Sequence, residues 1–140
     1  MDKEQRLQEK YLERQMVVAQ IRELQKQIET VEEKMVELAT ASQALDDLAS
    51  SEKGADMLAP ISDGIFVKAS LEDPEELIVN VGSGVCIPKK IPEAKKMLKE
   101  RLHEIASHRE AMIAELQKAA AYVDEVEQEL EALAGELKNV

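Results

Sequence analysis

Apolar residues recur at alternating spacings of three and four along both outer parts of the chain. The first row consists of Leu7, Lys10, Arg14, Val17, Ile21, Leu24, Ile28, Val31, Met35, Leu38, Ser42 and Leu45. The second row consists of Leu98, Leu102, Ile105, Arg109, Met112, Leu116, Ala119, Val123, Val126, Leu130, Leu133 and Leu137. Such spacing, with few polar members, is typical of the seam of a coiled coil. It predicts two long helices, at about residues 4–52 and 92–139.

The segment between the two rows has a different pattern. The cluster from Ser50 to Gly54 has poor helix propensity and marks the end of the first helix. All four prolines follow it, and Pro92 suits the first turn of the second helix. Short apolar runs flank residues 62–64 (Ser-Asp-Gly) and 82–84 (Gly-Ser-Gly), which predicts two β-hairpins joined by the polar segment 71–76. The expected strands are residues 58–61, 65–70, 77–81 and 85–90, within a block at about 57–91.

Two helices of equal length predict a mainly α fold, a long antiparallel coiled-coil hairpin with the β-hairpins between its helices. We expect a single domain over residues 1–140. The residue numbers of facing positions should then add up to about 144, which places Leu7 beside Leu137 and Ser42 beside Leu102. Both ends of the chain would meet. Pairing between helices of different chains is the alternative, but the short block between the helices makes local closure cost less entropy.

The two predicted hairpins carry more apolar residues than they can bury against each other. In a single chain they would leave exposed faces and open strand edges, which proteins usually remove by pairing. The sequence therefore predicts oligomerisation through the strands, and a closed four-stranded unit within one chain is the alternative. The residues concerned are Leu58, Ile61, Ile65, Phe66, Val67, Leu77, Ile78, Val79, Val81, Val85 and Ile87.

Composition supports long helices and limits the partners. Ala, Glu, Lys, Leu and Arg account for 72 of the 140 residues, whereas aromatic residues make up only 2%. Acidic residues outnumber basic residues by 29 to 18, so the field of the chain repels nucleic acid and anionic membranes. The N-terminus is charged, no apolar run approaches the ~20 residues that span a bilayer, and Cys86 has no second cysteine. We expect a cytoplasmic protein without nucleic-acid or membrane partners.

No group of residues predicts catalysis, a metal site or a cofactor. Residues 82–84 lie between expected strands and lack the lysine and the following helix of a phosphate loop. His103 and His108 are five residues apart, which does not align two ligands on one helix face. Neighbouring acids such as Asp46 and Asp47 point to different faces, and no nucleophile is paired with a base. We therefore expect that the protein is not an enzyme.

Residues 58–69 (Leu-Ala-Pro-Ile-Ser-Asp-Gly-Ile-Phe-Val-Lys-Ala) and 77–85 (Leu-Ile-Val-Asn-Val-Gly-Ser-Gly-Val) resemble the paired-hairpin signature of the prefoldins. The resemblance covers the whole chain and is to the archaeal-type α-class subunit. It implies that two α-class and four β-class subunits join through their strands into a double β-barrel that carries six coiled coils. It also implies an ATP-independent chaperone that grips unfolded protein clients at the coil ends and delivers them to a group II chaperonin. The sequence departs from the family pattern at Cys86 and Ile87, where a more polar or aromatic strand is expected.

The coil ends, where the termini are expected to meet, carry the candidate client-binding residues. Helix ends fray, so seam residues there can open at modest free-energy cost. The alternative role of these residues is to pack the coil, although Leu12, Met16 and Val140 lie off the seam. The candidate set is Leu7, Tyr11, Leu12, Met16, Val126, Leu130, Leu133, Leu137 and Val140.

The last part of the chain is strongly acidic, with 8 acids and 2 bases in residues 110–140. Such a run is usually a solvated face, and it also suits steering toward a basic chaperonin surface. Two other functions fit the same pattern. One is a scaffold or tether whose rods set the spacing between fixed partners, and the other is a filament-forming prefoldin relative.

Overall fold

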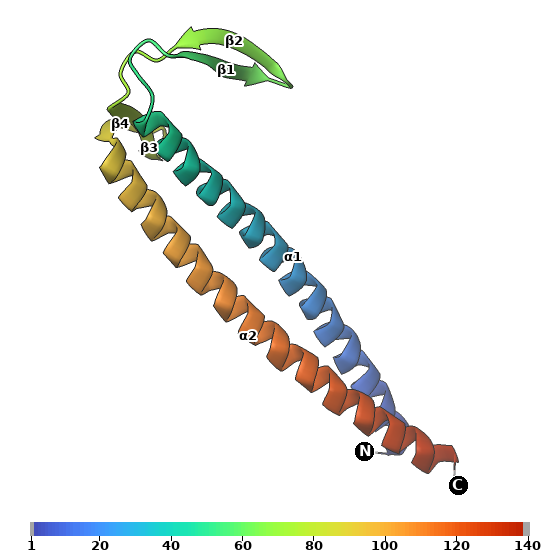
Figure 1. Cartoon of the computed structure of the whole chain (residues 1–140). Coiled ribbons are helices and arrows are strands. Elements are labelled where there is room, and N and C mark those ends of the chain that lie inside the picture. Colours follow the sequence, from blue (N-terminus) through green and yellow to red (C-terminus); the bar gives the residue numbers. More distant parts are fainter. Residues whose placement is uncertain (1, 139–140) are drawn as a thin grey trace. The chain divides into compact units, whose positions relative to one another are not determined.

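The computed structural model describes residues 2–138. The chain contains two long helices with four strands between them, as predicted (Figure 1). It divides into two compact units, which we call the terminal unit (residues 1–34 and 105–140) and the hairpin unit (residues 35–104). In chain order the elements are α1 (Lys3–Ala49), β1 (Asp56–Ser62), β2 (Ile65–Ser70), β3 (Glu76–Gly82), β4 (Val85–Lys90) and α2 (Ile91–Lys138).

Local side-chain hydrogen bonds mark both ends of α1. At its start the backbone N–H of Gln5 donates to Asp2 Oδ1 (2.8 Å), and the backbone N–H of Asp2 donates to Gln5 Oε1 (3.4 Å). This reciprocal pair is a capping box, which satisfies N–H groups that the first helical turn leaves free. At its end, the hydroxyls of Ser50 and Ser51 both donate to the carbonyl oxygen of Asp47 (2.9 and 3.0 Å). The helix therefore ends at Ala49, three residues before the predicted end.

In the terminal unit, α1 and α2 lie side by side and antiparallel (Figure 1). Among residues 2–34 and 105–138 of this unit, every buried side chain falls on a predicted seam row. Those of α2 include four at intervals of seven, which is the repeat of a single seam position in a coiled coil. The buried residues are Leu24 and Ile28 of α1 with Met112, Ala119, Val126, Leu130 and Leu133 of α2.

Ion pairs between the helices show the register, which differs from the predicted one. The residue numbers of the two partners add up to between 139 and 141, about one helical turn short of the predicted 144. The difference arises because α1 ends at Ala49 and α2 begins at Ile91, so the turning point lies earlier than assumed. The pairs are Lys3–Glu136, Lys10–Glu129, Arg14–Glu127, Glu32–Arg109 and Asp46–Lys95.

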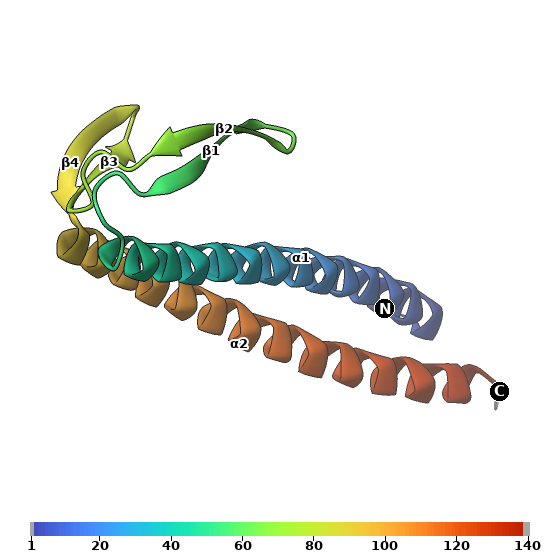
Figure 2. The same ribbon diagram turned by 45° about the horizontal axis from the view of Figure 1, so that its top comes forward.

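The four strands form two separate two-stranded antiparallel sheets, β1 with β2 and β3 with β4 (Figure 2). Each hairpin closes through a two-residue loop, Asp63–Gly64 or Ser83–Gly84, in which both residues have positive φ. Two positive φ values are the signature of a type I′ turn, whose twist matches that of the strands it joins. Glycine at the second loop position adopts this backbone conformation without the steric cost that a Cβ brings.

The two helices connect to the strands in different ways. Six residues separate α1 from β1, and two backbone hydrogen bonds tie this loop to Leu71, one from the N–H of Gly54 to the carbonyl of Leu71 (2.7 Å) and one from the N–H of Leu71 to the carbonyl of Ala55 (2.9 Å). On the other side β4 ends at Lys90 and α2 begins at the next residue. Pro92 lies in the first turn of α2, as predicted.

Candidate functional site

The hairpin unit exposes an extensive apolar surface on its strands. Nine of the eleven predicted assembly residues are exposed large side chains, and Leu77 and Val79 are half-buried. Ile78, in the middle of β3, is 70% exposed. Met57 is a further exposed apolar residue on β1, which sequence reasoning missed because the strand starts two residues earlier than expected. The exposed nine are Leu58, Ile61, Ile65, Phe66, Val67, Ile78, Val81, Val85 and Ile87.

Both faces of the first hairpin carry apolar residues near the turn, and the face of Pro60 and Phe66 turns polar farther from it, at Lys68 and at Asp56 with Ser70. Side chains alternate between the faces of a strand, and the pairing of Pro60 with Phe66 and of Ala59 with Val67 places these two pairs on opposite faces. An antiparallel sheet with one solvated face normally alternates apolar with polar residues, and near the turn of this hairpin that alternation is absent. An isolated two-stranded hairpin is marginally stable in water. The arrangement therefore suits strands that other chains cover.

A second distinctive feature of the chain lies in the terminal unit, where basic residues occupy positions on the seam of α1. Lys10 contacts Glu129 of α2 (Nζ to Oε2, 2.8 Å) and Glu13 of its own helix (3.3 Å). Arg14 donates from Nε and Nη2 to Oε1 of Glu127, both at 3.1 Å. These cations occupy positions where a coiled coil normally places apolar residues. Carboxylates of α2 thus bind the charged groups of Lys10 and Arg14 at the edges of the seam.

Hydrogen bonds to Glu129 and Glu13 raise the pKa of Lys10 above its ordinary value of 10.5. A raised pKa means that these contacts stabilise the folded chain fully below pH 10.5 and lose their effect as the pH rises through the raised value. We expect Lys10→Gln, which removes the charge without adding an apolar seam residue, to lower the melting temperature of the helices at pH 9 and to have a vanishing effect at the most alkaline pH tested. Circular dichroism melts across this range measure the difference. Lys118→Gln removes the same charge from an exposed position of α2 and serves as the control. An equal pH dependence in both variants would contradict the assignment.

The candidate client-binding residues differ strongly in exposure. Tyr11, Leu12 and Met16 are exposed on α1, with Met16 at 73%, whereas Leu7 and Leu137 are half-buried. Three residues of α2 lie buried against α1, namely Val126, Leu130 and Leu133. Val140 lies outside the described residues. The spacing along α1 explains the exposed group, because Leu12 and Met16 are four residues apart on the helix face that points away from the seam.

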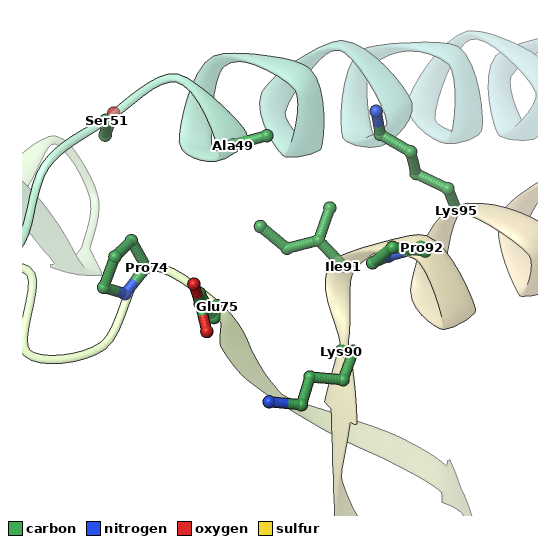
Figure 3. Close-up of a pocket in the computed structure, with 8 residues that line it drawn as sticks. All are labelled: Ala49, Ser51, Pro74, Glu75, Lys90, Ile91, Pro92 and Lys95. Atoms are coloured by element: carbon green, nitrogen blue, oxygen red, sulfur yellow. The ribbon is translucent and has the colours of Figure 1, made fainter.

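A surface hollow of about 660 Å³ lies in the hairpin unit, where the second hairpin meets the helices (Figure 3). Ile91 points from the first turn of α2 toward Ala49 in the last turn of α1. Ile91 and Ala94 are buried, so they anchor the beginning of α2. Lys90, Lys95 and Glu75 also line the hollow, and Lys95 forms an ion pair with Asp46. Ser51 lines the hollow as well, and its hydroxyl donates to the carbonyl oxygen of Asp47, so the described contacts of this lining are packing, a helix-end hydrogen bond and a salt bridge.

Among residues 2–138, no three His, Cys, Asp or Glu side chains gather in a way that could hold a metal ion. Cys86 is an exposed free thiol on β4. Neither of the described helices is long and apolar enough to cross a membrane. Among the described residues, the apolar strands and the exposed group Tyr11, Leu12 and Met16 of the terminal unit are surfaces that suit a protein partner.

Comparison with known proteins connects these features. A family model described as prefoldin subunit matches residues 17–136. Prefoldin subunit alpha of Archaeoglobus fulgidus is 28% identical over 72 residues, which cover 51% of this chain and 53% of that protein. Prefoldin subunit alpha of Thermofilum pendens is 32% identical over 67 residues, which cover 48% of this chain and 52% of that protein. The chain thus spans about half the length of these relatives in the matched regions.

A solved structure shares the fold. The filamentous prefoldin from Methanocaldococcus jannaschii, determined by cryo-EM, superposes with a TM-score of 0.73 at 19% sequence identity, covering 82% of this chain and 95% of that chain. The family model extends over both helices and all four strands, and both relatives are α subunits. The chain therefore belongs to the prefoldin family and is of the archaeal α-subunit type.

Proposed function

We propose that this chain is a subunit of an ATP-independent chaperone that holds non-native proteins at the end of its helix pair. The observation that carries the proposal is the exposed apolar group Tyr11, Leu12 and Met16 on a strongly charged helix. Exposed apolar residues that cluster on a soluble surface are typical of binding sites, and methionine adapts to surfaces of varied shape. Family membership supports a chaperone role. The remaining candidate residues would contribute when the helices part.

In this proposal the strands join the chain to other subunits. Two α-class and four β-class subunits join through their hairpins into a β-barrel platform, and residues 1–140 act as one prefoldin-like domain. The exposed apolar faces of both hairpins support this role, because a covering subunit would remove them from water. The assembly works in the cytoplasm and passes its clients to a group II chaperonin.

A second arrangement is assembly from copies of this chain alone. The likeness to a filamentous prefoldin favours it, because that structure has the same fold. Co-expression with a β-class subunit separates the two arrangements, since a mixed complex of defined size supports the first and continued growth of one-component assemblies supports the second. A tether without holding activity is separated from both by its failure to suppress the aggregation of a denatured test protein.

We expect the double substitution Leu12→Ser and Met16→Ser to weaken the suppression of client aggregation by roughly fivefold, because each change removes exposed apolar area that a client would bury. The measurement is light scattering of a denatured test protein diluted into the assembled chaperone. Val36→Ser is the matched control, since Val36 is an apolar residue of α1 with 66% exposure that lies outside the terminal unit. Undiminished suppression by the double variant, or an equal loss in the control, would refute binding at this end.

A further inference from the structure

We propose that the apolar row Val126, Leu130, Leu133 and Leu137 of α2 is a client-binding surface that the first turns of α1 occupy when no client is present. The preferred client segment is then apolar with basic residues at the spacings found in α1. This inference rests on the proposed holding function and names the surface and the client chemistry behind it.

The two sides of this contact are unequal. On α2 the seam is apolar at every position of the row, and Val126 is only 1% exposed. On α1 two successive seam positions are Lys10 and Arg14, whose side chains are 28% and 41% exposed. Long basic side chains can cover apolar surface with their aliphatic stems while their charged groups remain near water. The aliphatic parts of Lys10 and Arg14 therefore cover the α2 row, and they bury less apolar area against it than leucine side chains would.

The charged groups of these side chains are held by carboxylates beside the row. Glu127 and Glu129 bind Arg14 and Lys10, and Glu136 binds Lys3 at 3.3 Å. The carboxylate side chains are 46% to 54% exposed, and ion pairs in such positions contribute little net stability and weaken with salt. The ionic part of the contact between the beginning of α1 and this apolar row is thus weak and screened by salt, so the packing of Leu7, Val17 and the aliphatic stems supplies most of the attachment.

An incoming segment can replace α1 if it offers the same groups. Leu7, Lys10, Arg14 and Val17 form the occupying pattern, with apolar residues at both ends and two cations between them. A client helix with this pattern buries the same row and meets the same carboxylates. An acidic segment would instead face Glu127 and Glu129 and would be repelled. The α2 end thereby selects apolar segments that carry positive charge.

A peptide with the sequence of residues 2–18 tests this selection on the full-length assembled protein. We expect it to bind and to compete with a denatured client, and a second peptide with Lys10→Glu and Arg14→Glu to bind at least roughly tenfold more weakly at low salt. Fluorescence anisotropy of labelled peptides gives both affinities. Equal affinities of the two peptides, or binding that does not respond to salt, would overturn the charge selection.

Substitutions in the protein test the displacement of α1. Lys10→Leu with Arg14→Leu completes the apolar seam, and we expect the α1 end to hold its place and client affinity to fall by roughly threefold or more. Arg109→Leu is the matched control, because Arg109 is also a seam cation paired with a glutamate, Glu32 at 3.1 Å, but on α2 away from the row. We expect the Arg109→Leu variant to have a higher melting temperature and an unchanged affinity for clients. An unchanged affinity of the double variant, or an equal loss in both, would overturn the displacement.

The outcomes also separate this inference from the proposed function. If the protein holds clients and the Leu12 and Met16 substitutions weaken holding while the leucine seam variant does not, holding stands and displacement falls. If no form of the assembled protein suppresses aggregation, the proposed function itself falls.

Discussion

Ile78→Asp is expected to convert the assembled protein into smaller species by raising the dissociation constant of the strand interface by roughly a hundredfold or more, about 3 kcal/mol. Ile78 is 70% exposed in the single chain, so the substitution removes little packing within the subunit. A carboxylate placed in an apolar interface loses its hydration without gaining a partner, which is strongly unfavourable. Sedimentation velocity over a range of protein concentrations measures the change.

Val36→Asp provides the control for this experiment. Val36 has nearly the same exposure, 66%, and undergoes the same chemical change, but it lies on α1 outside the strands. The control should assemble as the unchanged protein does, and both variants should keep their helical circular dichroism. An Ile78→Asp protein that sediments like the unchanged one would show that β3 does not carry the interface.

Val126→Asp should have the largest effect on stability among single changes in the terminal unit. Val126 is the most deeply buried large side chain, at 1% exposure, and it faces α1. Arg14 lies opposite this position in the observed register but is already bound to Glu127. Burying a further carboxylate there should therefore cost on the order of 3 kcal/mol, or force the two helices apart in this unit. Thermal or urea unfolding followed by circular dichroism measures the loss.

The same Val36→Asp variant isolates burial as the cause, because it introduces the same charge at an exposed site of a neighbouring helix. Its free energy of unfolding should change by less than about 0.5 kcal/mol, as is usual for surface substitutions. If both variants lose the same stability, the helix pair does not depend on the seam at Val126. Increased proteolysis near both termini in Val126→Asp alone would support local opening of the helix pair.

The helices and their contact faces could be predicted because the seam repeats over many turns, so an error at one position does not move the rest. The register could not be predicted to one turn, since it depends on where the helices end. The hydroxyl groups of Ser50 and Ser51 bind the Asp47 carbonyl and stop α1 at Ala49. Helix propensity alone places that stop only within a few residues.

The partners of the seam cations depend on this register and were therefore not predictable. The sequence does carry a signal, because Lys10 and Arg14 lie on α1 while the facing half of α2 is strongly acidic. The outward position of Leu12 and Met16 was predictable from spacing alone, and the structure leaves both exposed. The faces of the strands were harder to assign, because a register shift between Pro60 and Ser62 interrupts the alternation of β1.

The direct junction between β4 and α2 sets the rotational phase of one helix against the sheet. No residue separates Lys90 from Ile91, so the pleat of β4 determines which face α2 presents from its first turn onward. One residue more or less at this point would rotate every later position of α2 by about 100°. The six-residue loop after Ala49 imposes no such phase on α1. A change of length can therefore be accommodated in the loop between α1 and β1, whereas the same change between β4 and α2 would alter which face of α2 meets α1.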